Sequence, residues 1–150
     1  MNAERPMIVF AEDDPDDRML LEEACAEDPL DYEIHFVEDG EVLLDALEGA
    51  LKGGGTLARL PHLVVLDLNM PRMDGREALA AIRQHPMLRA LPVVVFSTSN
   101  SPLDIARCAE LGANSFVIKP SSFERLVATM QAISHYWLNV AQQPPREANP

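Results

Sequence analysis

Cysteines and basic side chains are scarce in this sequence. The two cysteines, Cys25 and Cys108, form no closely spaced pair, so we expect reduced thiols and neither a disulfide nor a thiolate metal site. None of the four histidines has zinc-ligand spacing. The 12 lysines and arginines against 24 acidic residues give a net charge of -12, which disfavours nucleic acids and anionic membranes as partners.

Long hydrophobic runs are also absent. No stretch approaches the roughly 18 apolar residues that a membrane helix needs, and the first residues enter an acidic segment instead of a signal-peptide cleavage site. We therefore expect a soluble, cytoplasmic protein. The 150 residues, of which 47% are hydrophobic, suffice for the core of one compact domain.

Five short runs rich in β-branched residues alternate with longer helix-like segments. This order is typical of an α/β protein whose parallel sheet is covered by helices on both faces. The second run alternates polar and apolar residues, which predicts an edge strand. The five predicted strands are residues 7–11, 32–37, 63–67, 92–97 and 114–119.

Helix boundaries carry their own signals. Asp14 before Pro15, and Ser101 before Pro102, are typical of a capping residue followed by a proline at the first helical position. Gly112 stands where a left-handed residue would end the fourth helix.

Polar side chains follow the carboxyl ends of four predicted strands. Acids at a helix start are usually caps, and a lone serine or lysine means little. In an open α/β sheet, however, ligands bind at the carboxyl ends of the strands, and four such groups together favour one shared site. The residues are Glu12, Asp13 and Asp14 after the first strand, Asp67 after the third, Ser97 at the end of the fourth and Lys119 after the fifth.

Carboxylates gathered in one crevice repel one another unless a cation compensates them. Mg²⁺ is the cation that fits such a site most simply, because it prefers oxygen ligands and is commonly bound by one or two carboxylates plus a phosphoryl group. This chemistry predicts phosphoryl transfer to Asp67 as the nucleophile, with Lys119 and the Ser97 hydroxyl stabilising the remaining phosphoryl oxygens.

At these residues the sequence closely resembles the receiver domain of two-component response regulators. The matching segments are "IVFAEDDPDD", "LVVLDLNMPRMDGRE", "LPVVVFSTS" and "GANSFVIKP", and the resemblance runs from residue 7 to about residue 140. It implies the flavodoxin-like (βα)5 fold, a doubly wound parallel five-stranded sheet in the order 2-1-3-4-5. We expect a receiver domain at 1–141, no output domain after it, and a disordered tail at 142–150.

The resemblance also implies a role for each matching residue. Asp67 is the phospho-acceptor, Glu12 and Asp13 complete the carboxylate ligands of Mg²⁺, and Asn69 lends its backbone carbonyl to the metal.

The same resemblance implies a switch. Ser97 is the hydroxyl that moves to the phosphoryl group, Phe116 is the aromatic that then turns inward, and Lys119 is the lysine of the site, with a cis bond to Pro120. Phosphorylation would thereby repack the surface of the fourth helix, fifth strand and fifth helix.

A finer resemblance rests on the segments "STSNSPLDIARCAELGANSFVIKPSSFERL" and "ISHYWLNV". They are similar to single-domain regulators that partner bacterial phytochromes and related sensor histidine kinases. The resemblance implies a phosphohistidine donor on such a kinase. Output would occur by protein contact, either as relay to a histidine phosphotransfer protein or as a phosphate sink.

The last predicted helix carries two groups of apolar residues. About 20 residues of helix extend roughly 30 Å, longer than a strand of five or six residues, so the final turns should overhang the sheet. We expect the overhang to build a homodimer with the fourth-helix and fifth-strand surface, although simple core packing is the alternative. The residues expected to face the sheet are Phe123, Leu126, Val127, Met130, Ile133 and Trp137; those of the overhang are Tyr136, Trp137, Leu138 and Val140.

Three other functions compete with this interpretation. An aspartate-nucleophile phosphatase would need a second acid two positions after Asp67, where Asn69 cannot act as a general acid. A flavin-binding electron carrier would need a phosphate loop where "EDDPDD" would repel phosphate. A receiver-shaped scaffold that takes no phosphate is disfavoured by the intact acid, hydroxyl and lysine set. We therefore expect a signalling protein that catalyses only its own phosphorylation and dephosphorylation.

Overall fold

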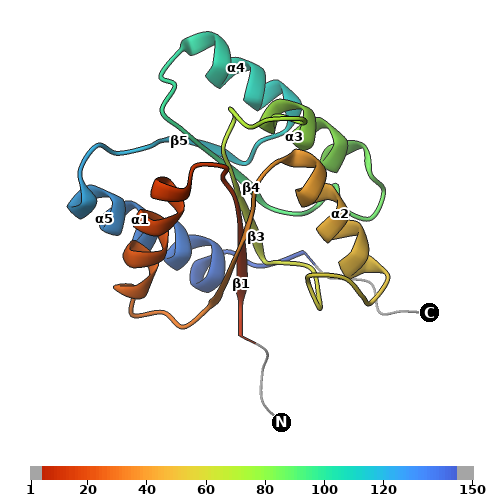
Figure 1. Cartoon of the computed structure of the whole chain (residues 1–150), viewed down its shortest axis with the longest axis horizontal. Helices are drawn as coiled ribbons and strands as arrows, with labels where there is room; N and C mark the ends of the chain where they lie inside the picture. The colour runs from red at the N-terminus through yellow and green to blue at the C-terminus, as the bar shows by residue number, and fades with distance from the viewer. Residues whose placement is uncertain (1–4, 145–150) are drawn as a thin grey trace.

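A computed structural model describes residues 5–144 and confirms the predicted sheet (Figure 1). Five parallel strands lie in the order β2-β1-β3-β4-β5. The strands are β1 (Met7–Ala11), β2 (Glu33–Val37), β3 (Leu63–Leu66), β4 (Val93–Ser97) and β5 (Ser115–Ile118). The helices are α1 (Pro15–Ala26), α2 (Gly40–Leu51), α3 (Gly75–Gln84), α4 (Pro102–Leu111) and α5 (Phe123–Ser134), followed by a π-helix, η1 (His135–Val140).

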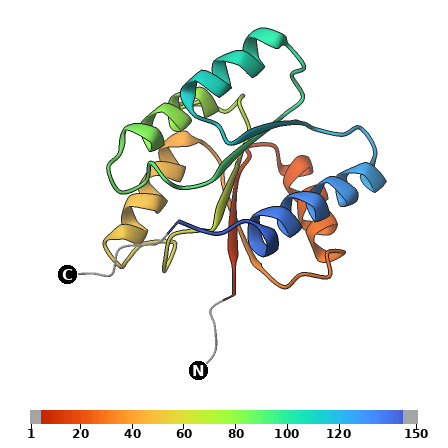
Figure 2. The ribbon, with the colours of Figure 1, turned by 180° about the vertical axis from the view of Figure 1, so that it is seen from behind.

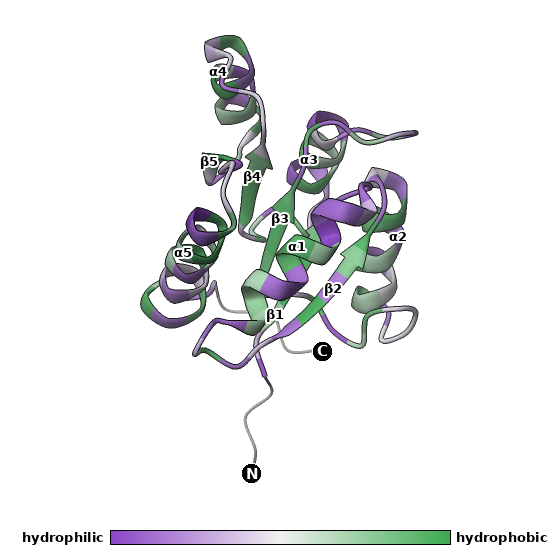
Figure 3. Cartoon of the chain, turned by 60° about the vertical axis from the view of Figure 1, so that its left-hand side comes forward, coloured by the Kyte–Doolittle hydropathy of each residue, from purple (hydrophilic) through white to green (hydrophobic). Residues whose placement is uncertain are grey.

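The helices cover both faces of the sheet: α1 and α5 lie on one, and α2, α3 and α4 on the other (Figures 1 and 2). Successive strand residues point to opposite faces. Val9 and Val64 therefore join the core beneath α2, α3 and α4, whereas Phe10 and Val65 join the core beneath α1 and α5. Figure 3 shows the resulting concentration of hydrophobic residues in β1, β3 and β4.

The predicted edge strand is also confirmed. In the part of the chain that the structure describes, β2 pairs only with β1 and keeps four of its five residues partly exposed, whereas every residue of β1, β3 and β4 is buried. Within residues 5–144, no helix combines the length and hydropathy needed to cross a bilayer. Cys25 and Cys108 are buried free cysteines.

The predicted helix boundaries occur where the sequence signals place them. The Asp14 carboxylate accepts from the amides of Asp16 and Asp17, and the Ser101 hydroxyl accepts from the amide of Asp104. Gly112 ends α4 with a φ of 99°, in the left-handed region that favours glycine. These boundaries fix where the chain passes from each strand into the next helix.

Two predictions about the last helix are wrong, one about its length and one about the side chain of Phe123. The α-helix ends at Ser134 and continues as η1, whose wider winding brings consecutive Trp137 and Leu138 against the core under α1 and α5. Phe123 begins α5 and is 36% exposed, so it does not face the sheet as predicted. Of the predicted disordered tail, residues 145–150 lie outside the described residues.

Candidate functional site

The carboxyl ends of the central strands bring the predicted site residues to one edge of the sheet. Backbone hydrogen bonds continue the ladder just past the strands: the amide of Glu12 donates to Val37, that of Asp67 to Ala11 and that of Lys119 to Ser97. Because the parallel strands end in register, the side chains that follow them converge.

Three carboxylates form a cluster at this edge. One oxygen each of Glu12, Asp13 and Asp67 lies within 4.8 Å of the others. Glu12 is 3% and Asp67 is 8% exposed, whereas Asp13 is exposed to solvent. A purely oxygen donor set with two buried members suits a hard divalent cation such as Mg²⁺, which also retains water ligands on its open side. Asn69, whose carbonyl is the fourth predicted ligand, is exposed two residues after Asp67.

Lys119 is the cation that the structure places among these acids. Its Nζ atom lies 2.6 Å from Oε1 of Glu12 and 3.6 Å from Oδ2 of Asp67. It also lies 3.3 Å from Oδ2 of Asp17, a third acidic partner that the sequence did not indicate. Lys119 therefore pairs most closely with Glu12, while its amine remains near the Asp67 carboxylate.

Burial dominates the electrostatics of the cluster. It raises the pKa of Asp67, and the charge of Lys119 and the amides of Leu68 and Asn69 offset this only in part. Burial likewise raises the pKa of Glu12, despite its bond to Lys119. For Lys119, burial alone would lower the pKa, but the hydrogen bond with Glu12 and the surrounding acids raise it. The single ammonium group of Lys119 thus compensates the charge of the three clustered carboxylates, Glu12, Asp13 and Asp67, only in part. A divalent cation would supply the remaining positive charge.

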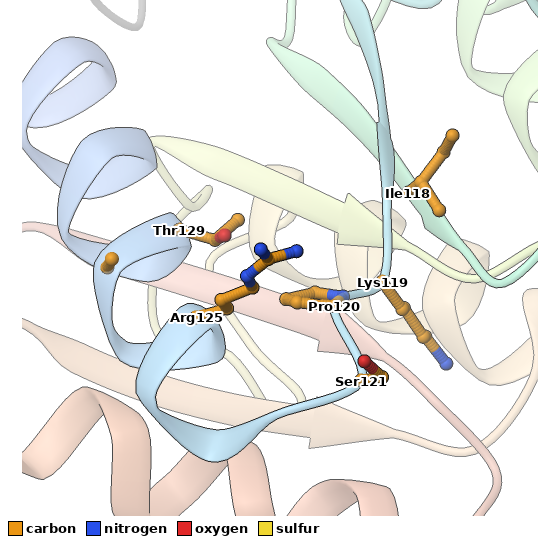
Figure 4. Close-up of a pocket in the computed structure, with 7 residues that line it drawn as sticks. Ile118, Lys119, Pro120, Ser121, Arg125 and Thr129 are labelled. Atoms are coloured by element: carbon orange, nitrogen blue, oxygen red, sulfur yellow. The ribbon is translucent and has the colours of Figure 1, made fainter.

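The groove beside Lys119 lies on the other side of its backbone. It is open, has a volume of about 490 Å³, and lies between Ile118 to Ser121 and the α5 residues Arg125 and Thr129. Figure 4 shows the Lys119 side chain directed away from Arg125 and Thr129. The ammonium group therefore belongs to the carboxylate cluster and not to this groove.

Gly75 packs against the backbone of Asp67, a contact that sequence reasoning missed. A Cβ atom at position 75 would lie 2.2 Å from the Asp67 carbonyl oxygen and 2.9 Å from the Cα of Leu68. The Gly75 amide also donates to the Leu68 carbonyl at 2.9 Å. The glycine of the "MDG" segment was the available signal, since close backbone approach is a standard reason for glycine.

A second missed contact fastens the loop between β3 and α3. Arg72 is the only non-glycine with a positive φ, 62°, among residues 5–144. Its Nε donates to Oδ2 of fully buried Asp39 at 2.7 Å, and its Nη2 lies 3.3 Å from Glu38. The amide of Gly40 donates to Met73 at 2.9 Å. The start of α2 thus holds the loop that follows Asp67.

The predicted switch residues lie on neighbouring strands. Ser97 is fully buried, and its hydroxyl oxygen accepts from the Ser99 amide at 3.1 Å. Phe116 pairs with Val95 across β4 and β5 and packs, partly buried, against the core under α2, α3 and α4. The predicted cis bond before Pro120 is wrong, because residues 5–144 contain no cis peptide bond. The trans form is the lower-energy isomer before proline by about 0.5–1 kcal/mol.

This fold and this acidic site define a class of protein. The sequence pattern of the response regulator receiver domain matches residues 8–131, and the chain belongs to this family. Among curated relatives, the probable methanogenesis regulatory protein FilR2 of Methanothrix harundinacea is 39% identical over 145 residues, which are 96% of this chain and 92% of FilR2.

Solved structures of response regulators are also similar. The phosphorylated cyanobacterial phytochrome response regulator RcpA is 34% identical with a TM-score of 0.84, over 95% of this chain and all of RcpA. The Mn²⁺-bound form of response regulator Rcp1, from Synechocystis, is 32% identical with a TM-score of 0.79, over 93% of this chain and 99% of Rcp1.

Proposed function

We propose that this receiver domain, at residues 1–141, accepts a phosphoryl group on Asp67 from a sensor histidine kinase. One observation carries the proposal: a buried carboxylate at a strand end lies 3.6 Å from a lysine amine and within 4.8 Å of two further acids. A structural ion pair needs one acid for one base. The excess of carboxylates suits a cation and a transferred anion instead.

The proposed transfer uses the chain's own groups in distinct roles. A carboxylate oxygen of Asp67 attacks the phosphorus of a phosphohistidine; an O–P bond forms, the P–N bond breaks, and its electron pair returns to the imidazole nitrogen. The Leu68 amide, 2.9 Å from Oδ1, orients the carboxylate. Lys119 lies close enough to stabilise charge on the phosphoryl oxygens.

Mg²⁺ is the cofactor that we propose. Glu12, Asp13, Asp67 and the backbone carbonyl of Asn69 would hold it, and the Mn²⁺-bound structure of Rcp1 supports a divalent-cation site in a related protein. When bound, the ion supplies positive charge to the phosphoryl oxygens. Catalysis then consists of the domain's own phosphorylation and dephosphorylation, with no turnover of another substrate.

The signal would pass through Ser97 and Phe116. We propose that the Ser97 hydroxyl moves to the phosphoryl group and that Phe116 then turns inward, which alters the surface of α4, β5 and α5. The buried hydroxyl on β4 and the incompletely buried ring on neighbouring β5 support a two-state change driven by local charge.

The partner chemistry follows from the relatives and the charge. The similar protein RcpA is a cyanobacterial phytochrome response regulator, which supports a bacteriophytochrome-type histidine kinase as the donor to this chain. We place the protein in the cytoplasm as part of this proposal. Its net charge of -12 argues against nucleic acids and anionic membranes as partners. The phosphoryl group would then pass to a histidine phosphotransfer protein or to water.

A homodimer through η1 is part of this proposal. Tyr136 and Val140 are 50% and 53% exposed, whereas Trp137 and Leu138 are partly buried against the core. The surface of α4 and β5 offers further exposed apolar side chains: Leu103, Ile105 and Ile118. Apolar groups on both surfaces would be buried if two copies joined there.

Phosphotransfer from a purified histidine kinase tests the proposal. The kinase is first labelled with radioactive ATP and freed of nucleotide, and then mixed with the wild-type chain or Asp67→Asn, with Mg²⁺ or with excess chelator. We expect rapid loss of label from the kinase and base-labile label on the wild-type chain only, and only with Mg²⁺. Equal labelling of Asp67→Asn would contradict the assignment of the acceptor.

A further inference from the structure

The loop between β4 and α4 is tied to two helices by a chain of polar contacts. The Ser99 hydroxyl donates to Oδ2 of Asp104 at 2.6 Å, and the other oxygen of Asp104 accepts from Arg76 at 2.8 Å. Ser99 lies in the loop, Asp104 in the first turn of α4 and Arg76 in the first turn of α3. We call these three side chains the loop network.

The backbone of Ser99 links the loop network to the switch hydroxyl. The backbone amide of Ser99 donates to the Ser97 hydroxyl oxygen at 3.1 Å, and the amide of Ser101 donates to the Ser99 hydroxyl oxygen at 3.2 Å. Movement of the Ser97 hydroxyl toward Asp67 would therefore break its hydrogen bond with the Ser99 amide, or it would displace Ser99 and strain the hydrogen bond between Ser99 and Asp104. The position of the hydroxyl depends on residues that contact neither the metal ligands nor the acceptor carboxylate.

The other end of the network approaches the acceptor through the backbone. Arg76 follows Gly75, whose Cα lies against the Asp67 carbonyl. Asp104 is partly exposed, but it accepts from two donors, one of them a guanidinium group, and such charge-assisted hydrogen bonds are stronger than neutral ones. The Ser99 hydroxyl and Arg76 lower the pKa of Asp104, so the carboxylate is charged at neutral pH.

We infer that Ser99, Asp104 and Arg76 are positioning residues that hold the Ser97 hydroxyl in its resting place, and that the network opens when Asp67 carries a phosphoryl group. This inference rests on the proposed function. It adds a restraint: the contacts stabilise the resting state, and their release frees the first turn of α4 together with the hydroxyl. The network thereby sets how much phosphorylation is needed to move the surface of α4.

Titration with beryllofluoride, a phosphoryl mimic, tests the restraint. Binding in the presence of Mg²⁺ is followed by fluorine NMR for the wild type, Ser99→Ala, Asp104→Ala and the conservative Ser99→Thr. If the network opens on binding, Ser99→Ala and Asp104→Ala bind beryllofluoride about tenfold more tightly, the order expected for one hydrogen bond to a charged group lost only in the bound state. Ser99→Thr keeps the hydroxyl and should behave as the wild type.

A control and a second readout separate positioning from general structure. Glu110→Gln removes a charge from α4 outside the network, where Glu110 lies 3.7 Å from Arg107, and it should leave the affinity unchanged. Thermal unfolding without beryllofluoride should show Ser99→Ala and Asp104→Ala to be less stable than the wild type. A merely structural role would lower stability without tightening binding.

The outcomes distinguish the two proposals. Wild-type affinity or weaker binding in both alanine variants overturns the restraint and leaves the acceptor assignment intact. Tightening in Ser99→Thr equal to that in Ser99→Ala overturns the role of the hydroxyl. A wild-type chain that binds no beryllofluoride with Mg²⁺, while remaining folded, overturns the proposed function and this inference together.

Discussion

Replacing Gly75 with alanine should damage both the stability of the domain and its acceptor site. The new Cβ would meet the Asp67 carbonyl oxygen at 2.2 Å, the Leu68 Cα at 2.9 Å and the Asp67 carbonyl carbon at 3.0 Å. These are backbone atoms, which cannot rotate away as a side chain does. Either α3 or the loop after Asp67 must shift.

The expected loss can be bounded from two opposing effects. Overpacking of this kind typically costs about 1–3 kcal/mol, and the backbone contact favours the upper part of that range. Alanine gains at most about 1 kcal/mol over glycine in a helix, and less at the first helical position. A net loss of about 2 kcal/mol lowers the melting temperature of a 150-residue domain by about 4–8 °C.

Thermal and urea unfolding of the metal-free protein measure this loss. Gly54→Ala is the matched control, because a Cβ at position 54 meets no atom within 4 Å. We expect its stability to lie within about 0.5 kcal/mol of the wild type. Labelling with acetyl phosphate should be slower in Gly75→Ala than in Gly54→Ala, since the shifted backbone carries Asp67. Wild-type stability and labelling in Gly75→Ala would refute the close approach.

Three further predictions concern charge and assembly. Burial alone would raise the pKa of Asp39, but hydrogen bonds from the Val42 amide and Arg72 lower it overall. The ionised Asp39 therefore stabilises the fold above about pH 4, and this stabilisation is lost as the pH falls further. Urea unfolding from pH 7 to pH 3 should show a smaller loss of stability on acidification for Asp39→Asn than for the wild type. An unchanged acid loss would contradict this role. Lys119→Met should raise the pKa of Asp67 further, as followed by carboxyl carbon NMR without metal, because Lys119 lowers that pKa in the wild type; a lower pKa would contradict the pairing. Tyr136→Glu should convert a wild-type dimer to a monomer in sedimentation equilibrium, whereas a monomeric wild type at high concentration would remove the proposed interface.

Local patterns predicted the parts of this protein that depend on local physics. Buried strands of the parallel sheet appear as apolar runs, and β2 appears as an alternating one because it lies at the edge of the sheet with four of its five residues partly exposed. Asp14, Ser101 and Gly112 act within one helical turn, so their spacing alone predicts the caps. The convergence of polar groups follows from parallel topology, which brings strand ends together whatever the distance along the chain.

Contacts between distant segments left no such signal. Arg72 and Asp39 are 33 residues apart, and Arg76 and Asp104 are 28 apart, so neither pair follows from helix or strand periodicity. The change from α5 to η1 after Ser134 was missed because apolar spacing cannot distinguish an α-helix from a wider π turn over six residues. Asp17 likewise matches the pattern of a helix-start acid, and only the tertiary fold brings it to Lys119.

The most direct test of the central claim is to locate the phosphoryl group. The wild-type chain is incubated with acetyl phosphate and Mg²⁺, the acyl phosphate is trapped by borohydride reduction, and the modified residue is identified by peptide mass spectrometry. We predict a single modified position, Asp67, with none detected when Mg²⁺ is chelated or when Asp67 is replaced by asparagine. Modification at another carboxylate, or undiminished labelling of Asp67→Asn, would contradict the account.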